Sequence, residues 1–210
     1  MRPTLILDLD GTLVDTLPDL LTSLNRVTGR GYTHTEIRPW IGDGAMALVR
    51  LALTARGRTA TEDDLRTLTA DYVRALSDQS QPYPGAADAL GALAAEGWRM
   101  AVCTNKPEQA ARALLAASGL LRHMDAVGGG DSFATRKPDP AHLLATLTAA
   151  GGDARAAVMA GDHQNDILAA IGAGMPAVFA TWGYGDDATG AAATTTGFAA
   201  LPEVVRRLIR

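Results

Sequence analysis

The sequence predicts an α/β protein in which helices cover both faces of a parallel sheet. Short apolar runs recur along the chain, and helix-like segments separate them. Strands that alternate with helices in this way form parallel sheets that are buried on both faces. One long interval, residues 15–81, contains no strand-like run and has helical patterning instead. We therefore expect an α/β core with a small helical domain inserted into it.

The core strands should form at the short apolar runs. These are residues 5–7, 100–103, 126–127, 157–160 and 177–180. Helices are expected at residues 86–96, 108–118, 141–150, 166–173 and 202–209. The last of these has apolar side chains at helical spacing, with arginines on the opposite face. Residues 190–197 contain only Gly, Ala and Thr, and this low complexity predicts a surface loop.

The helical insert begins after the first predicted strand. Its amphipathic helices are expected at residues 17–28, 44–55 and 62–76. The sequence Pro82-Tyr83-Pro84-Gly85 closes the insert, because Pro and Gly interrupt regular structure. The predicted domains are a core of residues 1–14 and 82–210 and an insert of residues 15–81.

The composition is that of an ordinary globular protein. Of 210 residues, 47% are hydrophobic and 20% are charged, and the net charge is −4. This excludes a disordered chain, and with Cys103 as the only cysteine it excludes a disulfide scaffold. Proteins that bind nucleic acids or anionic membranes are usually basic, so we expect neither kind of partner for this acidic chain. We expect no signal peptide, because two aspartates follow so soon after Met1, and no apolar run reaches about 18 residues, so the expected location is the cytoplasm.

Two aspartates follow the first predicted strand, in the sequence Asp8-Leu9-Asp10-Gly11-Thr12. Residues two apart on an extended chain face the same side, so both carboxylates should point one way. Such a pair can bind Mg²⁺, and it can divide the work of nucleophile and acid/base. The alternative is that both aspartates only cap the segment that follows.

A second pair, Asp162 and Asp166, follows the fourth predicted strand in the segment GDHQND. Parallel strands end at one edge of the sheet, so this pair should lie near Asp8 and Asp10. Four carboxylates there would repel one another strongly unless a cation neutralised them. Capping of the next helix is the alternative.

Polar side chains also follow the second strand, where Thr104, Asn105 and Lys106 precede a helix. Hydroxyl, amide and backbone N–H groups at a helix start can hold phosphate oxygens, although they can also serve only as a cap. Lys137 directly precedes Pro138 in the segment RKPDP. Lys106 and Lys137 are the only lysines among 19 basic residues. We hypothesise that both occupy places where a compact point charge matters, against the alternative of chance.

These segments together closely resemble the haloacid dehalogenase-like phosphatase superfamily. The family's four signatures occur in order, as DLDGT, the CTN turn, the KPDP lysine and GDHQND. The resemblance covers essentially the whole chain. It implies a Rossmann-like core with an α-helical cap, which the insert would form. His163 departs from the pattern, because Ser or Thr is commoner at that position.

The resemblance implies a role for each matching residue. Asp8 would attack phosphorus and form an aspartyl-phosphate, and Asp10 would act as the acid and base. Thr104, Asn105 and Lys137 would hold the phosphoryl group. Mg²⁺ would be bound by Asp8, the carbonyl of Asp10, Asp162 and Asp166, the last through water.

The cap loop, Trp40-Ile41-Gly42-Asp43-Gly44-Ala45, resembles that of bacterial phosphoglycolate phosphatases, which implies 2-phosphoglycolate as the substrate. Gly42 and Gly44 would let the loop approach a small substrate, near Asp43. Arg38 or Arg50 could then meet a substrate carboxylate. Leu20 stands where related sugar-phosphate mutases carry His, which favours hydrolysis.

Several alternatives remain open at this point. The same mechanism could act on a sugar phosphate, an amino-sugar phosphate or pyrophosphate, and a non-catalytic phosphate-binding module is a further alternative. The expected partner is a small phosphorylated metabolite, and the chain should be a monomer or a homodimer. We expect Cys103 to be an inert core residue. His34, His123 and His142 should lie at the surface or at helix ends.

Overall fold

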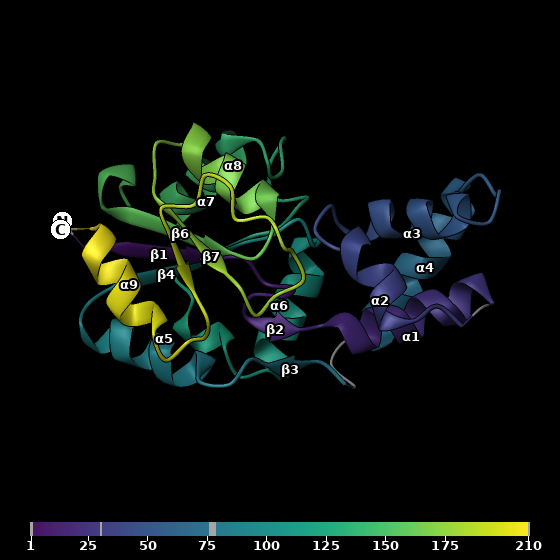
Figure 1. The fold of residues 1–210 in the computed structure, drawn as a ribbon, viewed down its shortest axis with the longest axis horizontal. Helices are drawn as coiled ribbons and strands as arrows, with labels where there is room; N and C mark the ends of the chain where they lie inside the picture. The colour runs from purple at the N-terminus through teal and green to yellow at the C-terminus, as the bar shows by residue number, and fades with distance from the viewer. Residues whose placement is uncertain (1, 30, 76–78, 210) are drawn as a thin grey trace.

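A parallel sheet of six strands forms the centre of the molecule in the computed structural model, which describes residues 2–29, 31–75 and 79–209. The strand order is β5-β4-β1-β6-β7-β8, and each neighbouring pair is parallel (Figure 1). The strands are β1 (Thr4–Leu7), β4 (Arg99–Cys103), β5 (Ala126–Gly128), β6 (Ala157–Gly161), β7 (Ala177–Ala180) and β8 (Ala193–Thr195). The α/β fold class is therefore confirmed.

Helices cover the two faces of this sheet. One face packs against α5 (Ala86–Ala95), α6 (Glu108–Ala117) and α9 (Leu201–Leu208), and the other against α7 (Pro140–Ala149) and α8 (Gln164–Gly172). In β1, Leu5 and Leu7 lie in the first of these cores, and Ile6 lies in the second. This is the alternation that a strand imposes, and it explains why a fully buried strand is apolar throughout.

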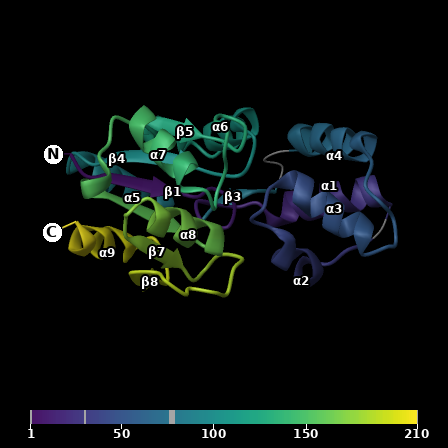
Figure 2. The same cartoon turned by 90° about the horizontal axis from the view of Figure 1, so that it is seen from above.

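A group of helices lies beyond the sheet, on the side of the molecule opposite the chain termini (Figures 1 and 2). It consists of α1 (Leu17–Thr28), α2 (His34–Ile37), α3 (Ala45–Thr54) and α4 (Glu62–Ala75), with a 3₁₀ turn at Arg38–Trp40. Its buried apolar side chains, such as Leu24, Ile37 and Val49, form a core of their own. Ala110 and Tyr184 of the α/β core also pack against it. We call this group of described helices the cap.

A short antiparallel ribbon connects the cap to the sheet. It pairs β2 (Val14–Asp15) with β3 (Gln81–Pro82), where the chain enters and leaves the cap. Two further 3₁₀ turns, Leu121–His123 and Ala154–Ala156, lie in the core. None of the described helices is both long and apolar enough to cross a membrane.

Two parts of the sequence-based assignment are wrong. Residues 190–197 are not a loop throughout, because Ala193–Thr195 form the edge strand β8 beside β7. Pairing with β7 gives this small-residue segment a structure that its composition does not indicate. The short helix α2 was also not expected; a capping box between Thr33 and Glu36 begins it. Residue 76, the expected end of the last cap helix, lies outside the described residues, and the domain boundaries stay a prediction.

Candidate active site

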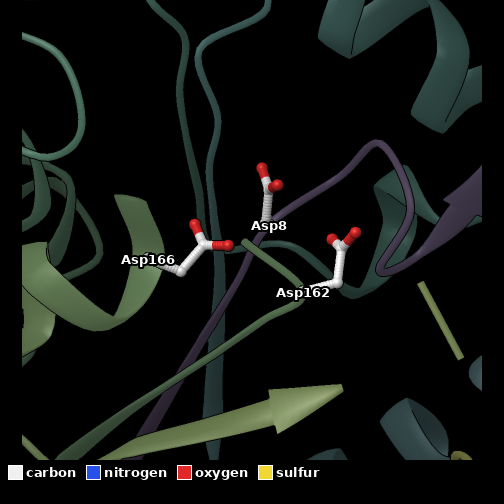
Figure 3. A group of neighbouring side chains, drawn as sticks. All are labelled: Asp8, Asp162 and Asp166. Atoms are coloured by element: carbon white, nitrogen blue, oxygen red, sulfur yellow. The ribbon is translucent and has the colours of Figure 1, made fainter. Parts of the chain in front are cut away.

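Three buried carboxylates meet at the end of the sheet that faces the cap. Asp8 directly follows β1, Asp162 directly follows β6, and Asp166 lies in the first turn of α8. Because β1 and β6 are neighbours in the sheet, their ends bring the three side chains together (Figure 3). One oxygen from each carboxylate lies within 4.8 Å of the others.

Hydrogen bonds fix the orientation of Asp162. Its Oδ1 accepts a bond of 2.6 Å from the hydroxyl of Thr12, and its Oδ2 accepts one of 2.7 Å from the backbone N–H of Tyr184. Gly11 has φ of +82°, and a Cβ there would lie 2.4 Å from Asp162 Oδ2. Only glycine therefore allows the turn after Asp10 to pass so close to this carboxylate.

Lys137 supplies positive charge beneath the carboxylates. Its buried Nζ lies 2.8 Å from Asp8 Oδ1 and 2.6 Å from Asp166 Oδ1. Burial alone would lower the pKa of this ammonium, but the carboxylates of Asp166 and Asp8 raise it above its usual value. The lysine therefore stays charged, and three buried acids face one buried cation.

One lysine does not neutralise three carboxylates, and the pKa values of two of these acids are raised. Burial, opposed by Lys137, raises the pKa of Asp8 to about 8. Burial and the neighbouring Asp166 raise that of Asp162 to about 6. A buried cluster of carboxylate oxygens is the donor set that Mg²⁺ prefers, and a divalent cation would restore the ionised state of both groups. The residues present thus fit a magnesium ion.

This electrostatic arrangement predicts a dependence of stability on pH. Folded Asp8 and Asp162 keep protons that the unfolded chain loses near pH 4, so the free energy of unfolding of the metal-free protein should fall from about pH 4 to about pH 8. Mg²⁺ binds the folded state and should offset this loss. We expect Mg²⁺ to raise the midpoint of thermal unfolding more at pH 8 than at pH 5.

The comparison requires EDTA-treated protein at matched ionic strength. Asp162→Asn should reduce the rise in the unfolding midpoint that Mg²⁺ causes, whereas Asp63→Asn on the exposed face of α4 should leave this rise unchanged. An equal or larger shift at pH 5 would contradict a magnesium site built from these acids.

Asp10 stands apart from the carboxylate cluster. Its Oδ1 accepts hydrogen bonds from the hydroxyl of Thr16 at 2.7 Å and from Nζ of Lys106 at 2.8 Å. Lys106 also lies 3.1 Å from Oδ2. The side chain of Asp10 thus points toward the turn after β4, while its backbone remains beside Asp8.

The turn after β4 forms one wall of a cavity of about 40 Å³ beside Asp8 and Asp10. Thr104, Asn105 and Lys106 contribute to this wall. The amide of Asn105 donates hydrogen bonds of 3.0 Å to the carbonyls of Gly42 and Lys137, which joins the cap loop to the lysine segment. Two glycines pack closely behind this turn: a Cβ on Gly130 would lie 2.4 Å from the carbonyl oxygen of Asn105, and one on Gly129 would lie 2.3 Å from the backbone N of Glu108 at the start of α6.

The cap loop forms the opposite wall. Gly42 and Gly44 line the cavity, whereas Asp43 turns to the core and accepts a hydrogen bond of 2.7 Å from the amide of Asn165. A Cβ on Gly42 would lie 2.5 Å from the ring of His163, so this histidine packs directly against the loop. The departure at His163 is thus a contact between core and cap.

The two arginines proposed for the cap do not line this cavity. Arg38 donates hydrogen bonds of 3.0 Å and 2.5 Å to the carbonyls of Tyr184 and Gly183 in the core. Arg50 lines a separate cavity together with Arg58. Arg38 therefore holds cap and core together, and Arg50 lies elsewhere on the cap.

Several residues of the site were not singled out from the sequence. They are Thr12, Thr16 and Tyr184, which orient carboxylates or the cap entrance, and the glycines at 128–130. His142 lies at a helix end as expected, but it is fully buried, and its Nδ1 accepts a hydrogen bond of 3.2 Å from the backbone of Lys137. Burial and the charge of Lys137 lower its pKa to about 4, so it is neutral. Thr12 belongs to the DLDGT signature, but its partner Asp162 is 150 residues away, and contacts of this kind arise only when distant segments meet.

Comparison with known proteins agrees with this geometry. Residues 3–174 match the family model for haloacid dehalogenase-like hydrolases. A phosphoglycolate phosphatase from Mesorhizobium japonicum is 42% identical over 88% of this chain and 85% of its own length. One from Rhodospirillum rubrum is 41% identical over 96% of this chain and 90% of its own.

The solved structures include a similar fold. A crystal structure of a predicted phosphoglycolate phosphatase from Haemophilus somnus 129PT superposes with a TM-score of 0.88 and 30% identity, and the match covers 97% of both chains. The signatures, the fold and these relatives agree, and the chain belongs to the haloacid dehalogenase-like hydrolase family.

Proposed function

We propose that this protein is a phosphatase that hydrolyses 2-phosphoglycolate through a phosphorylated Asp8. The observation that carries the proposal is the buried carboxylate of Asp8, paired with Lys137 and lying at the wall of the cavity between cap and core. The named relatives support the substrate.

Asp8 and Asp10 divide the chemical work in this proposal. An oxygen of Asp8 attacks phosphorus, and the ester oxygen of the substrate leaves with a proton from Asp10 as glycolate. Asp10 then takes a proton from water as the water attacks the phosphorus of the acyl-phosphate, which frees Asp8 and releases phosphate. Positioned acid–base groups contribute about 10²–10⁴-fold to such steps. Turning about its own side-chain bonds would bring the Asp10 carboxyl toward the ester oxygen.

Other residues would hold the phosphoryl group and the cation. Thr104, Asn105 and Lys137 would donate hydrogen bonds to phosphoryl oxygens. Asp8, Asp162 and the carbonyl of Asp10 would hold Mg²⁺, with Asp166 through water. The bound ion would supply positive charge that offsets the repulsion between an anionic substrate and Asp8.

The cap favours a small substrate. The cavity has room for roughly three water molecules. Its cap wall is apolar at Leu20, Ile41 and Leu48. A short substrate is therefore the kind over which cap and core can close and exclude water.

A panel of phosphomonoesters tests this function. We expect phosphate release from 2-phosphoglycolate in Mg²⁺ with kcat/KM of about 10⁴ M⁻¹s⁻¹ or more, well above sugar phosphates, amino-sugar phosphates and pyrophosphate. EDTA should abolish release. A different preferred substrate would overturn the substrate assignment and keep the phosphatase. No release from any member, with Mg²⁺ bound, would leave a phosphate-binding module.

A further inference from the structure

Lys106 is a buried cation that the roles above leave unused. It lies between β4 and α6, its side chain is 4% exposed, and it lines the cavity beside Asp8. Its Nζ lies 2.8 Å and 3.1 Å from the two carboxylate oxygens of Asp10. The backbone of the same residue is fixed by a hydrogen bond of 3.2 Å from its N–H to the hydroxyl of Thr104.

The charges around the cavity are distributed unevenly. Among the described residues that line it, Lys106 is the one cation, and the cap contributes apolar side chains and glycines. Lys137 lies behind Asp8, in contact with Asp8 and Asp166. The guanidinium of Arg38 is bound to core carbonyls, and Arg50 lines another cavity.

A substrate with a second anionic group needs a partner for it in this cavity. A carboxylate taken from water into an apolar cavity is costly unless a cation and hydrogen bonds meet it. In 2-phosphoglycolate the carboxylate is separated from the ester oxygen by a single carbon. When Asp10 turns toward the ester oxygen, the carboxylate one carbon away would take its place as the partner of Lys106, which lines the same cavity.

We propose that Lys106 binds the substrate carboxylate and thereby selects a short phosphorylated carboxylic acid, an inference that rests on the proposed function. An ammonium carries three N–H donors on one point charge, so it can serve more than one acceptor. The rarity of lysine in an arginine-rich sequence agrees with this role, because a planar guanidinium is larger and fixed in shape.

The test compares two substrates of equal chain length, 2-phosphoglycolate and ethyl phosphate, which lacks the carboxylate. For the wild type, Lys106→Met and Lys106→Gln, kcat/KM is measured for both. We expect each variant to lower the ratio of kcat/KM for 2-phosphoglycolate to kcat/KM for ethyl phosphate by about 10²-fold or more. The KM for 2-phosphoglycolate should rise. The ratio is informative because any disturbance of Asp10 lowers both rates together.

Two controls accompany the ratio. Arg112→Met removes an exposed cation from α6, and the ratio should stay at its wild-type value. Lys106→Gln keeps an N–H donor toward Asp10, so the ratio can be measured with this variant if Lys106→Met does not fold. Unfolding midpoints verify that each variant is native.

An equal fall for both substrates would overturn the proposal, because Lys106 would then act only through Asp10. Failure of the proposed function has a different signature. It appears in the wild type alone, as hydrolysis without a preference for 2-phosphoglycolate or as no hydrolysis.

Discussion

Asp8→Asn is expected to lower kcat by about 10⁴-fold or more, because an amide cannot form the covalent bond to phosphorus. The fold should be retained. Asn has the shape of Asp, and Lys137 keeps its ion pair with Asp166, 2.6 Å away. Phosphate release from 2-phosphoglycolate in Mg²⁺ measures the loss, and thermal unfolding verifies the fold.

The matched control for this variant is Asp88→Asn in the first turn of α5, away from the cavity. It makes the same chemical change and should leave kcat near the wild-type value. Substantial turnover by Asp8→Asn would remove Asp8 from the role of nucleophile. Such turnover would indicate that a water molecule attacks phosphorus directly.

Lys137→Met is expected to have the largest effect on stability. It leaves Asp8 and Asp166 buried without the cation that lies within 2.8 Å of both. Removal of one partner from a buried ion pair costs about 3–5 kcal/mol of unfolding free energy. Urea unfolding without Mg²⁺ at pH 8 measures the change.

A second variant separates charge from packing in this prediction. The double variant Asp8→Asn/Lys137→Met also removes the Asp8 carboxylate that Lys137→Met leaves unpaired. Its loss of unfolding free energy should therefore be smaller than the sum of the losses in the two single variants. Arg155→Met breaks only an exposed pair with Asp153 and should produce no comparable loss. A loss from Lys137→Met as small as that from Arg155→Met would contradict the structural role of this lysine.

The sheet and its helices could be predicted because their signals are local. Apolar runs such as residues 157–160 mark strands that are buried on both faces, and the structure extends this one to Gly161. The helix expected at residues 17–28 is Leu17–Thr28 in the structure, where Pro18 lies at its start and Gly29 adopts the left-handed conformation at its end. The edge strand β8 escaped prediction because only its neighbour β7 defines it.

The candidate site could be predicted as a set of residue types but not as a network. The motifs identify Asp8, Asp162 and Asp166, which the structure brings together. They do not reveal that Asp10 is bound to Lys106, or that Asp43 turns to Asn165. These contacts join segments about 100 residues apart, so no local pattern encodes them.

Identification of a covalent phosphoenzyme tests the central claim most directly. The wild type is mixed with 2-phosphoglycolate and Mg²⁺, quenched in acid within one turnover, and its peptides are analysed by mass spectrometry. We expect a phosphoryl group on the peptide that contains Asp8, formed at least as fast as kcat and absent from Asp8→Asn. Turnover without a phosphorylated Asp8, or a phosphoryl group on another residue, would contradict the assignment of Asp8 as the nucleophile.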